Sequence, residues 1–445
     1  MSAALCDLAR YQTALRQHST LRFQGRVAQV IGLSIEVEGL RLAVGDVCTI
    51  HPDADGPYFS AEVVGFRDDR LIVMPFSETH GVRPGSAVFP RGHGFNVPVG
   101  PSLLGRVLNG LGQPIDGRGP LGTVEQYPIV NRPPDPLTRQ PIREPLSLGI
   151  RALDGLLTCG KGQRLGIFAG SGVGKSTTLG MIARNTQADV NVVALIGERG
   201  REVQEFIDRD LGPAGLARSV VVVSTSDQPA LQRIKAAWIA TAVAEYFRDQ
   251  GLHVTLMMDS VTRWAMAQRE IGLTVGEPPV VKGYPPSVFA LLPKLLERAG
   301  TGEHGTITGL YTVLVDGDDV TEPIADAARS ILDGHVWLSR KLAHENHYPA
   351  IDVLGSVSRC MSGLADAAHR RAASRLRDAL ATYHNSEDLI SIGAYAAGTN
   401  PALDEAIALM PSILAFLRQD ATEPSTYAET LSALYALFPE TNDGH

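Results

Sequence analysis

The sequence predicts an α/β core with a mainly parallel sheet, preceded by a small β-barrel and followed by a helical domain. In the middle of the chain, short apolar segments typical of buried strands alternate with stretches of helical periodicity. Before them, short strand-like segments are interrupted by glycines at regular intervals, as in small barrels. After about Ser362 the strand pattern stops, and segments rich in Ala and Leu follow.

These patterns divide the 445 residues into four parts. A chain of this length exceeds what one hydrophobic core usually supports, so more than one domain is expected. The predicted parts are a short helix, the barrel, the α/β core and the helical domain, at residues 1–20, 21–92, 93–360 and 361–445.

The segments outside the core have distinct patterns. Apolar residues at helical spacing predict an amphipathic helix in residues 1–20, either packed on its own domain or serving as a docking handle for a partner or a membrane surface. In the barrel, residues 33–38 alternate apolar and polar side chains. The five prolines of residues 131–145 exclude a continuous helix and predict a stiff connector inside the core domain.

The elements of the core and of the C-terminal domain are predicted from their periods. Strands are expected at residues 164–168, 190–196, 219–224, 254–258 and 306–315. A helix with one apolar side is expected at residues 231–248. Further helices are expected at residues 365–381, 403–418 and 425–437.

The composition is ordinary for a globular protein and argues against several classes. Apolar residues make up 44% and charged residues 20%, and no run of 18 apolar residues is present. The net charge of -8 lacks the basic footprint of a nucleic-acid binder, so no nucleic-acid partner is expected. The four cysteines are widely spaced and the N-terminus lacks a signal-peptide core, which together favour a reducing cytoplasm.

Residues 168–180, FAGSGVGKSTTLG, nearly match the phosphate-binding loop G-x-x-x-x-G-K-[ST]. Ala169 stands where the first glycine is expected, at the end of a predicted strand, where extended backbone tolerates a methyl group. The turn itself keeps the glycines that let successive N–H groups point at phosphate oxygens. The predicted nucleotide-binding loop comprises Ala169, Gly170, Ser171, Gly172, Val173, Gly174, Lys175, Ser176 and Thr177.

Four side chains, two of them in this loop, complete a site for phosphoryl transfer to water. Lys175 is expected to contact the β- and γ-phosphates, and the Ser176 hydroxyl to bind Mg²⁺. Asp259, at the end of an apolar strand, is expected on the opposite side of the metal. Glu198 follows another strand and is suited to orient the attacking water, although a solvated helix start explains the local pattern equally well.

Longer segments resemble a known family. The sequences GERGREVQEFI, MDSVTRWAMAQREIG, GEPPVVKGYPPSVFALLPKLLERAG and YPAIDVLGSVSR are similar to those of the ATPase of the bacterial flagellar and type III protein export apparatus, within the ATP synthase alpha/beta superfamily. The resemblance extends over about residues 20–420 and implies a RecA-like P-loop ATPase core. The segment GYPPSVFALLP looks more like the flagellar branch than the virulence-secretion branch.

The resemblance implies roles for particular residues. Glu198 matches the catalytic carboxylate, and Arg359 matches an arginine finger that reaches into the site of a neighbouring subunit. Arg263 and Arg199 are further candidates for charge near the phosphates. Two aromatic residues are expected on the adenine, with ordinary packing as the alternative for both. They are Tyr348 and Tyr395.

The resemblance also implies an assembly and partners. One chain carries both the catalytic carboxylate and the finger, so a homohexameric ring that hydrolyses ATP with Mg²⁺ is expected. The implied partners are a regulator at the N-terminal helix, a stalk protein in the ring pore, export substrates and chaperones, and the export gate. The implied location is cytoplasmic, peripheral at the inner face of the cytoplasmic membrane.

Three other functions were weighed against this one. A rotary ATP synthase headpiece subunit would require a heteromeric ring. A ring-shaped RNA translocase would require a basic, aromatic barrel, whereas the barrel here offers the acidic residues Glu36 and Glu38. A noncatalytic nucleotide-binding scaffold is disfavoured by Glu198.

Two segments resemble metal-binding motifs but lack the ligand spacing. The pair His344 and His347 lacks the spacing of a zinc motif. The acidic residues 316–319 lack the spacing of a Ca²⁺ loop.

Overall fold

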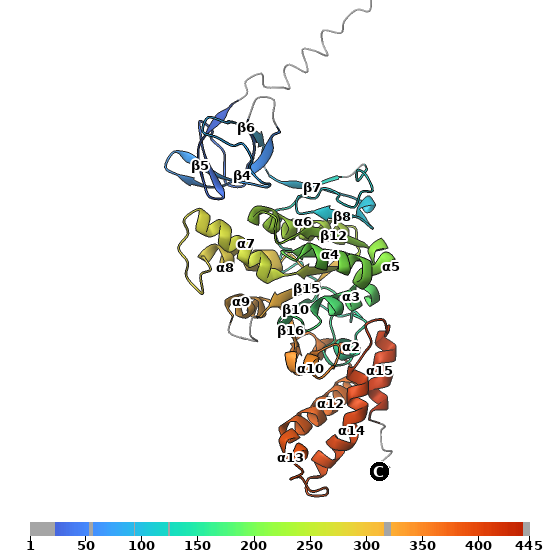
Figure 1. The fold of residues 1–445 in the computed structure, drawn as a ribbon. Helices are drawn as coiled ribbons and strands as arrows, with labels where there is room; N and C mark the ends of the chain where they lie inside the picture. Colours follow the sequence, from blue (N-terminus) through green and yellow to red (C-terminus); the bar gives the residue numbers. More distant parts are fainter. Residues whose placement is uncertain (1–22, 53–56, 93, 123–124, 316–321, 439–445) are drawn as a thin grey trace, which may run out of the picture. The chain divides into compact units, whose positions relative to one another are not determined.

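The computed structural model describes residues 23–52, 57–92, 94–122, 125–315 and 322–438 (Figure 1). The helix expected in residues 1–20 and the acidic residues 316–319 lie outside the described residues. The chain forms two compact units, one of Met1–Phe95 with Thr274–Gly276 and the other of Asn96–Leu273 with Glu277–His445. No helix in the described part of the chain combines the length and the apolar character needed to cross a membrane.

The first unit contains a closed β-barrel, as predicted. Its strands close in the order β1-β2-β5-β4-β3-β6. The strands are β1 (Gly25–Ile31), β2 (Ser34–Glu38), β3 (Val47–His51), β4 (Phe59–Arg67), β5 (Arg70–Pro75) and β6 (Ala87–Gly92). Alternation along β2 puts Ile35 and Val37 in the apolar core of the barrel.

Glu36 faces away from the apolar core of the barrel but is covered by neighbouring side chains, so it does not form an open acidic surface. It accepts hydrogen bonds from Gln29 at 2.8 Å, Arg67 at 2.9 Å and Arg70 at 3.0 Å. The hydrogen bonds from Gln29 and Arg70 lower the pKa of Glu36 and keep it ionised. The carboxylate is therefore part of the barrel structure.

The second unit is built on a nine-stranded sheet. The main strand order is β17-β16-β10-β15-β13-β11-β12-β8, with β14 paired to β15. The strands are β8 (Val107–Asn109), β10 (Arg164–Ala169), β11 (Val190–Ile196), β12 (Ser219–Ser224), β13 (His253–Asp259), β14 (Gly300–Thr301), β15 (Thr306–Leu314), β16 (Gly334–Leu338) and β17 (Ile351–Ser358). All pairs along the main path are parallel except β16 with β17.

The predicted core strands are confirmed, and four further strands were not predicted from the sequence. They are β8, β14, β16 and β17. The first two have only three and two residues, too few to show a period. Strand β16 alternates buried positions with the half-buried His335 and Trp337, and β17 contains Gly355, so neither forms a continuous apolar run.

Helices pack against this sheet. Helix α6 (Ala230–Asp249) covers β11, β12 and β13, and α9 (Pro323–Ile331) contacts β10 and β15. The remaining helices before the C-terminal domain are η1 (Pro101–Leu103), α2 (Arg151–Leu156), α3 (Lys175–Asn185), α4 (Gly200–Glu205), the π-helix η2 (Phe206–Leu211), α5 (Gly212–Ala217), α7 (Val261–Thr274), α8 (Pro286–Leu296), α10 (Arg340–His344) and α11 (Met361–Leu364). A separate ribbon pairs β7 (Asn96–Val99) with β9 (Glu125–Pro128).

The C-terminal domain is helical, as predicted. Its helices are α12 (Ala367–Asn385), α13 (Glu387–Ser391), α14 (Pro401–Leu417) and α15 (Tyr427–Ala436). Helices α12, α14 and α15 pack on α2, and α15 lies beside it in Figure 1. Leu376, Ile413 and Leu434 belong to the same apolar core as the strands of the sheet. The C-terminal helices and the sheet are thus one packed body.

A buried ion pair fastens the proline-rich connector to this body. Arg298 donates to both carboxylate oxygens of Glu245 at 2.7 and 2.6 Å and to the Ile129 carbonyl at 2.6 Å. Asn131 donates to the same Glu245 carboxylate at 3.1 Å. Residues 131–144 form neither helix nor strand, so such side-chain bonds fix their course.

We predict that Arg298→Met lowers the free energy of unfolding by about 3–5 kcal/mol, because it leaves the Glu245 carboxylate buried without a counter-charge. The double variant Arg298→Met/Glu245→Met should recover most of this loss. Urea unfolding without nucleotide measures both. A double variant no more stable than the single one would contradict the assignment of the loss to an unpaired buried charge.

Candidate functional site

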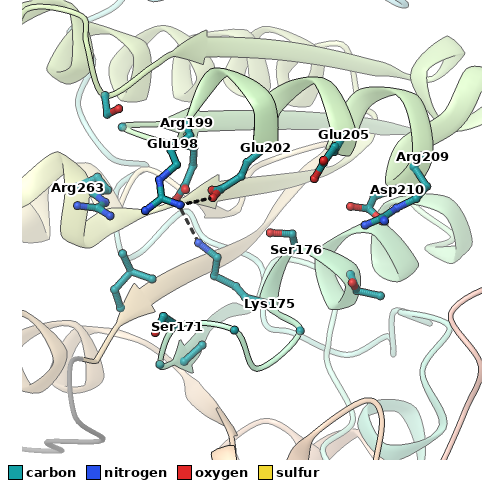
Figure 2. Close-up of a pocket in the computed structure, with 18 residues that line it drawn as sticks. Ser171, Lys175, Ser176, Glu198, Arg199, Glu202, Glu205, Arg209, Asp210 and Arg263 are labelled. Atoms are coloured by element: carbon teal, nitrogen blue, oxygen red, sulfur yellow. Dashed lines mark hydrogen bonds and ion pairs between the residues drawn. The ribbon is translucent and has the colours of Figure 1, made fainter. Parts of the chain in front are cut away.

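The polarity of the parallel sheet gathers the predicted site at one edge. Strands β10, β11 and β13 all end there, so the phosphate loop, Glu198 and Asp259 follow neighbouring strand ends. A cavity of about 660 Å³ opens at this edge, as Figure 2 shows. The lining residues are Ala169, Gly170, Ser171, Gly172, Gly174, Lys175, Ser176, Thr177, Gly197, Glu198, Arg199, Glu202, Glu205, Arg209, Asp210, Ser226, Arg263 and Leu314.

The phosphate loop has the backbone that its sequence requires. Gly172 and Gly174 adopt left-handed conformations, with φ of 77° and 89°, which side chains with a Cβ disfavour. Ala169 is the last residue of β10, in extended backbone, so the missing glycine is tolerated there. Helix α3 begins at Lys175, and its first N–H groups face the cavity side of the loop. The loop is therefore built to bind an anion.

Lys175 lies between two carboxylates at the base of the cavity. Its Nζ is 2.6 Å from Asp259 Oδ1 and 3.1 Å from Glu198 Oε1. Burial opposes the charge of Lys175, but the two carboxylates outweigh it and raise the pKa of the ammonium group. Thr312 donates its hydroxyl to Asp259 Oδ1 at 2.7 Å and fixes that carboxylate.

Glu198 has an unusual acidity. Burial, followed by the charge of Asp259, raises the pKa of Glu198 to about 7, although Lys175 acts in the opposite direction. Its backbone is held from both sides, because Gly197 donates to the Ser224 carbonyl at 2.7 Å and Ser226 donates to the Glu198 carbonyl at 3.0 Å. A pKa near neutrality suits a carboxylate that accepts hydrogen bonds from water during catalysis.

A small cavity next to Ser176 has both oxygen-bearing and apolar side chains in its lining. Its volume is about 10 Å³, and Ser176, Glu198, Glu202 and Asp259 line it together with Leu195, Val203 and Phe206. Hard cations take hydroxyl and carboxylate oxygens. The residues predicted from the sequence, Ser176 and Asp259, therefore fit a magnesium ion.

The cavity includes acidic and basic residues that the sequence did not single out. Glu202 lies in the first turn of α4, and Arg209 and Asp210 lie in the π-helix η2. Glu202 follows Glu198 by four residues in the same charged segment, which is the signal that could have found it. The π-helix has no comparable sequence signal.

Arg263 and Arg199, the two further candidates for charge near the phosphates, both line the cavity. Arg263 extends from α7 toward it in Figure 2, and its Nε is buried without a partner in the described structure. Gly197 makes room for it, since a Cβ there would lie 2.8 Å from the Arg263 Cβ. Arg199 is largely exposed and contacts Glu202 at 3.4 Å. Of the two, Arg263 is the better placed for an anion.

Arg359 lies at the opposite edge of the sheet. Strand β17 runs antiparallel to β16, so Ile351 pairs with Leu338 near the loop, whereas Ser358 pairs with Gly334 at the far edge. The six residues of β10 separate the two edges by roughly 17 Å. Arg359 is exposed there and does not line the cavity of its own chain.

The two predicted adenine residues are in different places. Tyr348 precedes β17 and lies against the loop, where a Cβ on Gly174 would be 3.5 Å from its ring. Tyr395 is not near the cavity. It follows α13, and its hydroxyl donates to Asp404 at 2.9 Å and to the Asn400 carbonyl at 3.1 Å. These contacts hold the loop before α14, so the expectation that Tyr395 closes the nucleotide site is corrected.

The pair His344 and His347, which lacks the spacing of a zinc motif, has ordinary surroundings. His347 is buried, and burial lowers its pKa. His344 ends α10 and is partly exposed. Within the described ranges, no group of three or more His, Cys, Asp or Glu side chains is arranged to hold a metal ion.

Comparisons with known proteins agree with this architecture part by part. A model of the ATP synthase alpha/beta family, nucleotide-binding domain, matches residues 149–358, and the beta-barrel domain of that family matches residues 27–92. A model of the T3SS EscN ATPase C-terminal domain matches residues 365–436.

Whole-chain relatives extend the match. The flagellum-specific ATP synthase of Bacillus subtilis is 55% identical over 93% of this chain and 94% of its own length. The type 3 secretion system ATPase of Xanthomonas euvesicatoria is 52% identical over 97% of this chain and 98% of its own.

Solved structures are similar over the same extent. The assembled ATPase EscN from the type III secretion system of enteropathogenic E. coli is 47% identical, with a TM-score of 0.88 over 93% of this chain and 99% of that one. EscN in complex with its central stalk EscO matches with a TM-score of 0.86 at 47% identity. The chain belongs to the ATP synthase alpha/beta family, in its branch of flagellum-specific and type III secretion ATPases.

Proposed function

We propose that this chain hydrolyses magnesium-bound ATP in a homohexameric ring and that turnover energises flagellar protein export. The observation that carries the ring is the separation of the phosphate loop and Arg359 at opposite edges of one sheet. A finger at the far edge serves a site on a second copy, and a closed ring gives every site such a neighbour.

In the proposed reaction, each residue acts at a stated atom of ATP or water. The loop N–H groups and Lys175 bind the β- and γ-phosphates. The Lys175 ammonium group then pairs with phosphate oxygens instead of the carboxylates of Asp259 and Glu198. Glu198, released from Lys175, accepts a hydrogen bond from the attacking water and orients it. Arg263 and the neighbour's finger neutralise charge on the γ-phosphate oxygens, and Tyr348 packs on the adenine.

Ser176 and Asp259 would hold Mg²⁺. When bound, the ion neutralises charge on the β- and γ-phosphates. The small cavity lined by their oxygens supports this assignment.

The role in export is supported by the relatives. The names of similar proteins include both flagellar and type III secretion ATPases, at 55% and 52% identity, so identity alone does not separate the two systems. The segment GYPPSVFALLP favours the flagellar one. The complex of EscN with its central stalk supports a stalk protein as a partner here. We include in the proposal the regulator, the chaperones and substrates, the export gate and the location at the cytoplasmic face of the membrane.

We predict that Glu198→Gln and Arg359→Ala, which each lose most of the rate of ATP hydrolysis, recover activity when they assemble in mixed rings. A site regains both groups when an Arg359→Ala chain supplies the loop and Glu198, and its neighbour supplies the finger. In an equal mixture about a quarter of the sites are complete. ATP hydrolysis and binding of a fluorescent ATP analogue are measured at a concentration that favours assembly.

The matched control mixes Glu198→Gln with Lys175→Ala. Both residues line the same cavity of one chain, so no mixed site contains both, and activity should stay at background. Recovery in this control, or none in the first mixture, would contradict a finger supplied by a neighbour.

We also predict a pH dependence set by Glu198. The carboxylate orients water only when ionised, and its pKa is raised to about 7, so kcat/KM for ATP should fall about tenfold per pH unit below that value and level off above it. ATP affinity of Glu198→Gln, measured over the same range, separates this effect from protonation of the nucleotide. A kcat/KM profile that stays flat to pH 5.5 after this correction would argue against Glu198.

A further inference from the structure

We propose that Gln163 is a positioning residue that sets the direction of the Arg359 finger through the backbone on either side of it. The inference rests on the proposed function, because it assigns a role to groups around the finger. It concerns the far edge of the sheet, where the turn before β10 meets the end of β17.

The side chain of Gln163 is fully buried, and all of its hydrogen bonds are made at this junction. Its Nε2 donates to Ser358 Oγ at 3.1 Å and to the Asp333 carbonyl at 3.3 Å. Its Oε1 accepts from the Gly160 N–H at 2.9 Å, which fixes the amide plane. The amide thus links the turn before β10 to the strand that ends at the finger.

Both acceptors of Gln163 Nε2 lead directly to Arg359. The Asp333 carbonyl also accepts the Arg359 N–H at 3.0 Å, so one oxygen binds the finger's backbone and the Gln163 side chain. Ser358 is the residue before the finger, and its hydroxyl donates to the Thr158 carbonyl at 2.8 Å. The finger's own peptide and the one before it are therefore held to the same turn.

Asp333 is itself held by a rigid neighbour. Its carboxylate accepts from Arg164 Nε at 3.0 Å and from Arg164 Nη2 at 3.0 Å. The Arg164 backbone N–H donates to the same carboxylate at 3.0 Å. The paired hydrogen bonds of the fork leave little freedom at Asp333. The shared carbonyl is therefore a fixed reference point for Arg359.

The guanidinium of Arg359, by contrast, has no hydrogen bond or ion pair in the described part of this chain. A long side chain that is held only through its own backbone takes its direction from the position of that backbone. Misplacing a catalytic group by about 1 Å costs up to 10²-fold in rate. An apolar side chain at position 163 would leave Ser358 Oγ and the Asp333 carbonyl without this donor and let the root shift.

The test is a double-variant cycle on the assembled full-length enzyme. Gln163→Met keeps the length of the side chain and removes its hydrogen bonds. We expect it to lower kcat about tenfold with KM for ATP within about twofold, because the bound nucleotide lies at the other edge. In the Arg359→Ala background the same substitution should have no further effect on kcat, because the group it positions is absent.

The matched control is Asn191→Leu, which also removes a fully buried amide at the same edge of the sheet. Asn191 donates to the Ala183 carbonyl at 2.9 Å and does not contact the finger. It should lower the Tm and leave kcat unchanged. If Gln163→Met prevents assembly, Ser358→Ala replaces it, with the same expected dependence on Arg359.

The outcomes separate the inference from the function on which it rests. A Gln163→Met effect that multiplies with that of Arg359→Ala, or one that appears in KM instead of kcat, would overturn the positioning role. A wild-type rate for Arg359→Ala alone would instead overturn the finger itself.

Discussion

The direction of the strands is the constraint on which the rest of this structure depends. Because strands β10, β11 and β13 run parallel, they bring the phosphate loop, Glu198 and Asp259 to one edge of the sheet. The reversal at β17, along the main path of the sheet, sends Arg359 to the other edge. In the proposed reaction, a chain folded in this way contains all the groups for hydrolysis but does not bring them to one place, and assembly with further copies would bring them together.

The resting site is balanced by charge. Lys175 neutralises Asp259 and Glu198, which would otherwise be two buried carboxylates in mutual repulsion. In the proposed reaction, the triphosphate competes for the same ammonium group and leaves a cation as the partner of Asp259 and water as the partner of Glu198. Burial and, after it, the charge of Asp259 raise the pKa of Glu198, and Lys175 opposes this shift. The proposal therefore links nucleotide binding and orientation of the water through one lysine.

The sequence predicted the parts of the site that depend on local order. A phosphate loop, a strand that ends in Asp259 and a strand followed by Glu198 are readable because neighbouring residues create them. The prediction that Tyr395 packs on the adenine failed, because the sequence of a loop does not indicate which distant surface an aromatic side chain contacts. Gln163 was missed for a related reason, since its partners Asp333 and Ser358 lie far along the chain. The segment of β17 matches a family motif, but at the edge of the sheet it lacks the continuous apolar run by which a buried strand is predicted.

The same reversal explains why one short segment takes part in two sites. Tyr348, just before β17, lies against the phosphate loop of its own chain, and Arg359, just after it, faces away toward the far edge. Strand β17 connects them, and only its two ends pair in register with β16, Ile351 and Asp352 at one end and Val357 and Ser358 at the other. In the proposed ring, contacts to two different nucleotide sites therefore lie at the two ends of one strand.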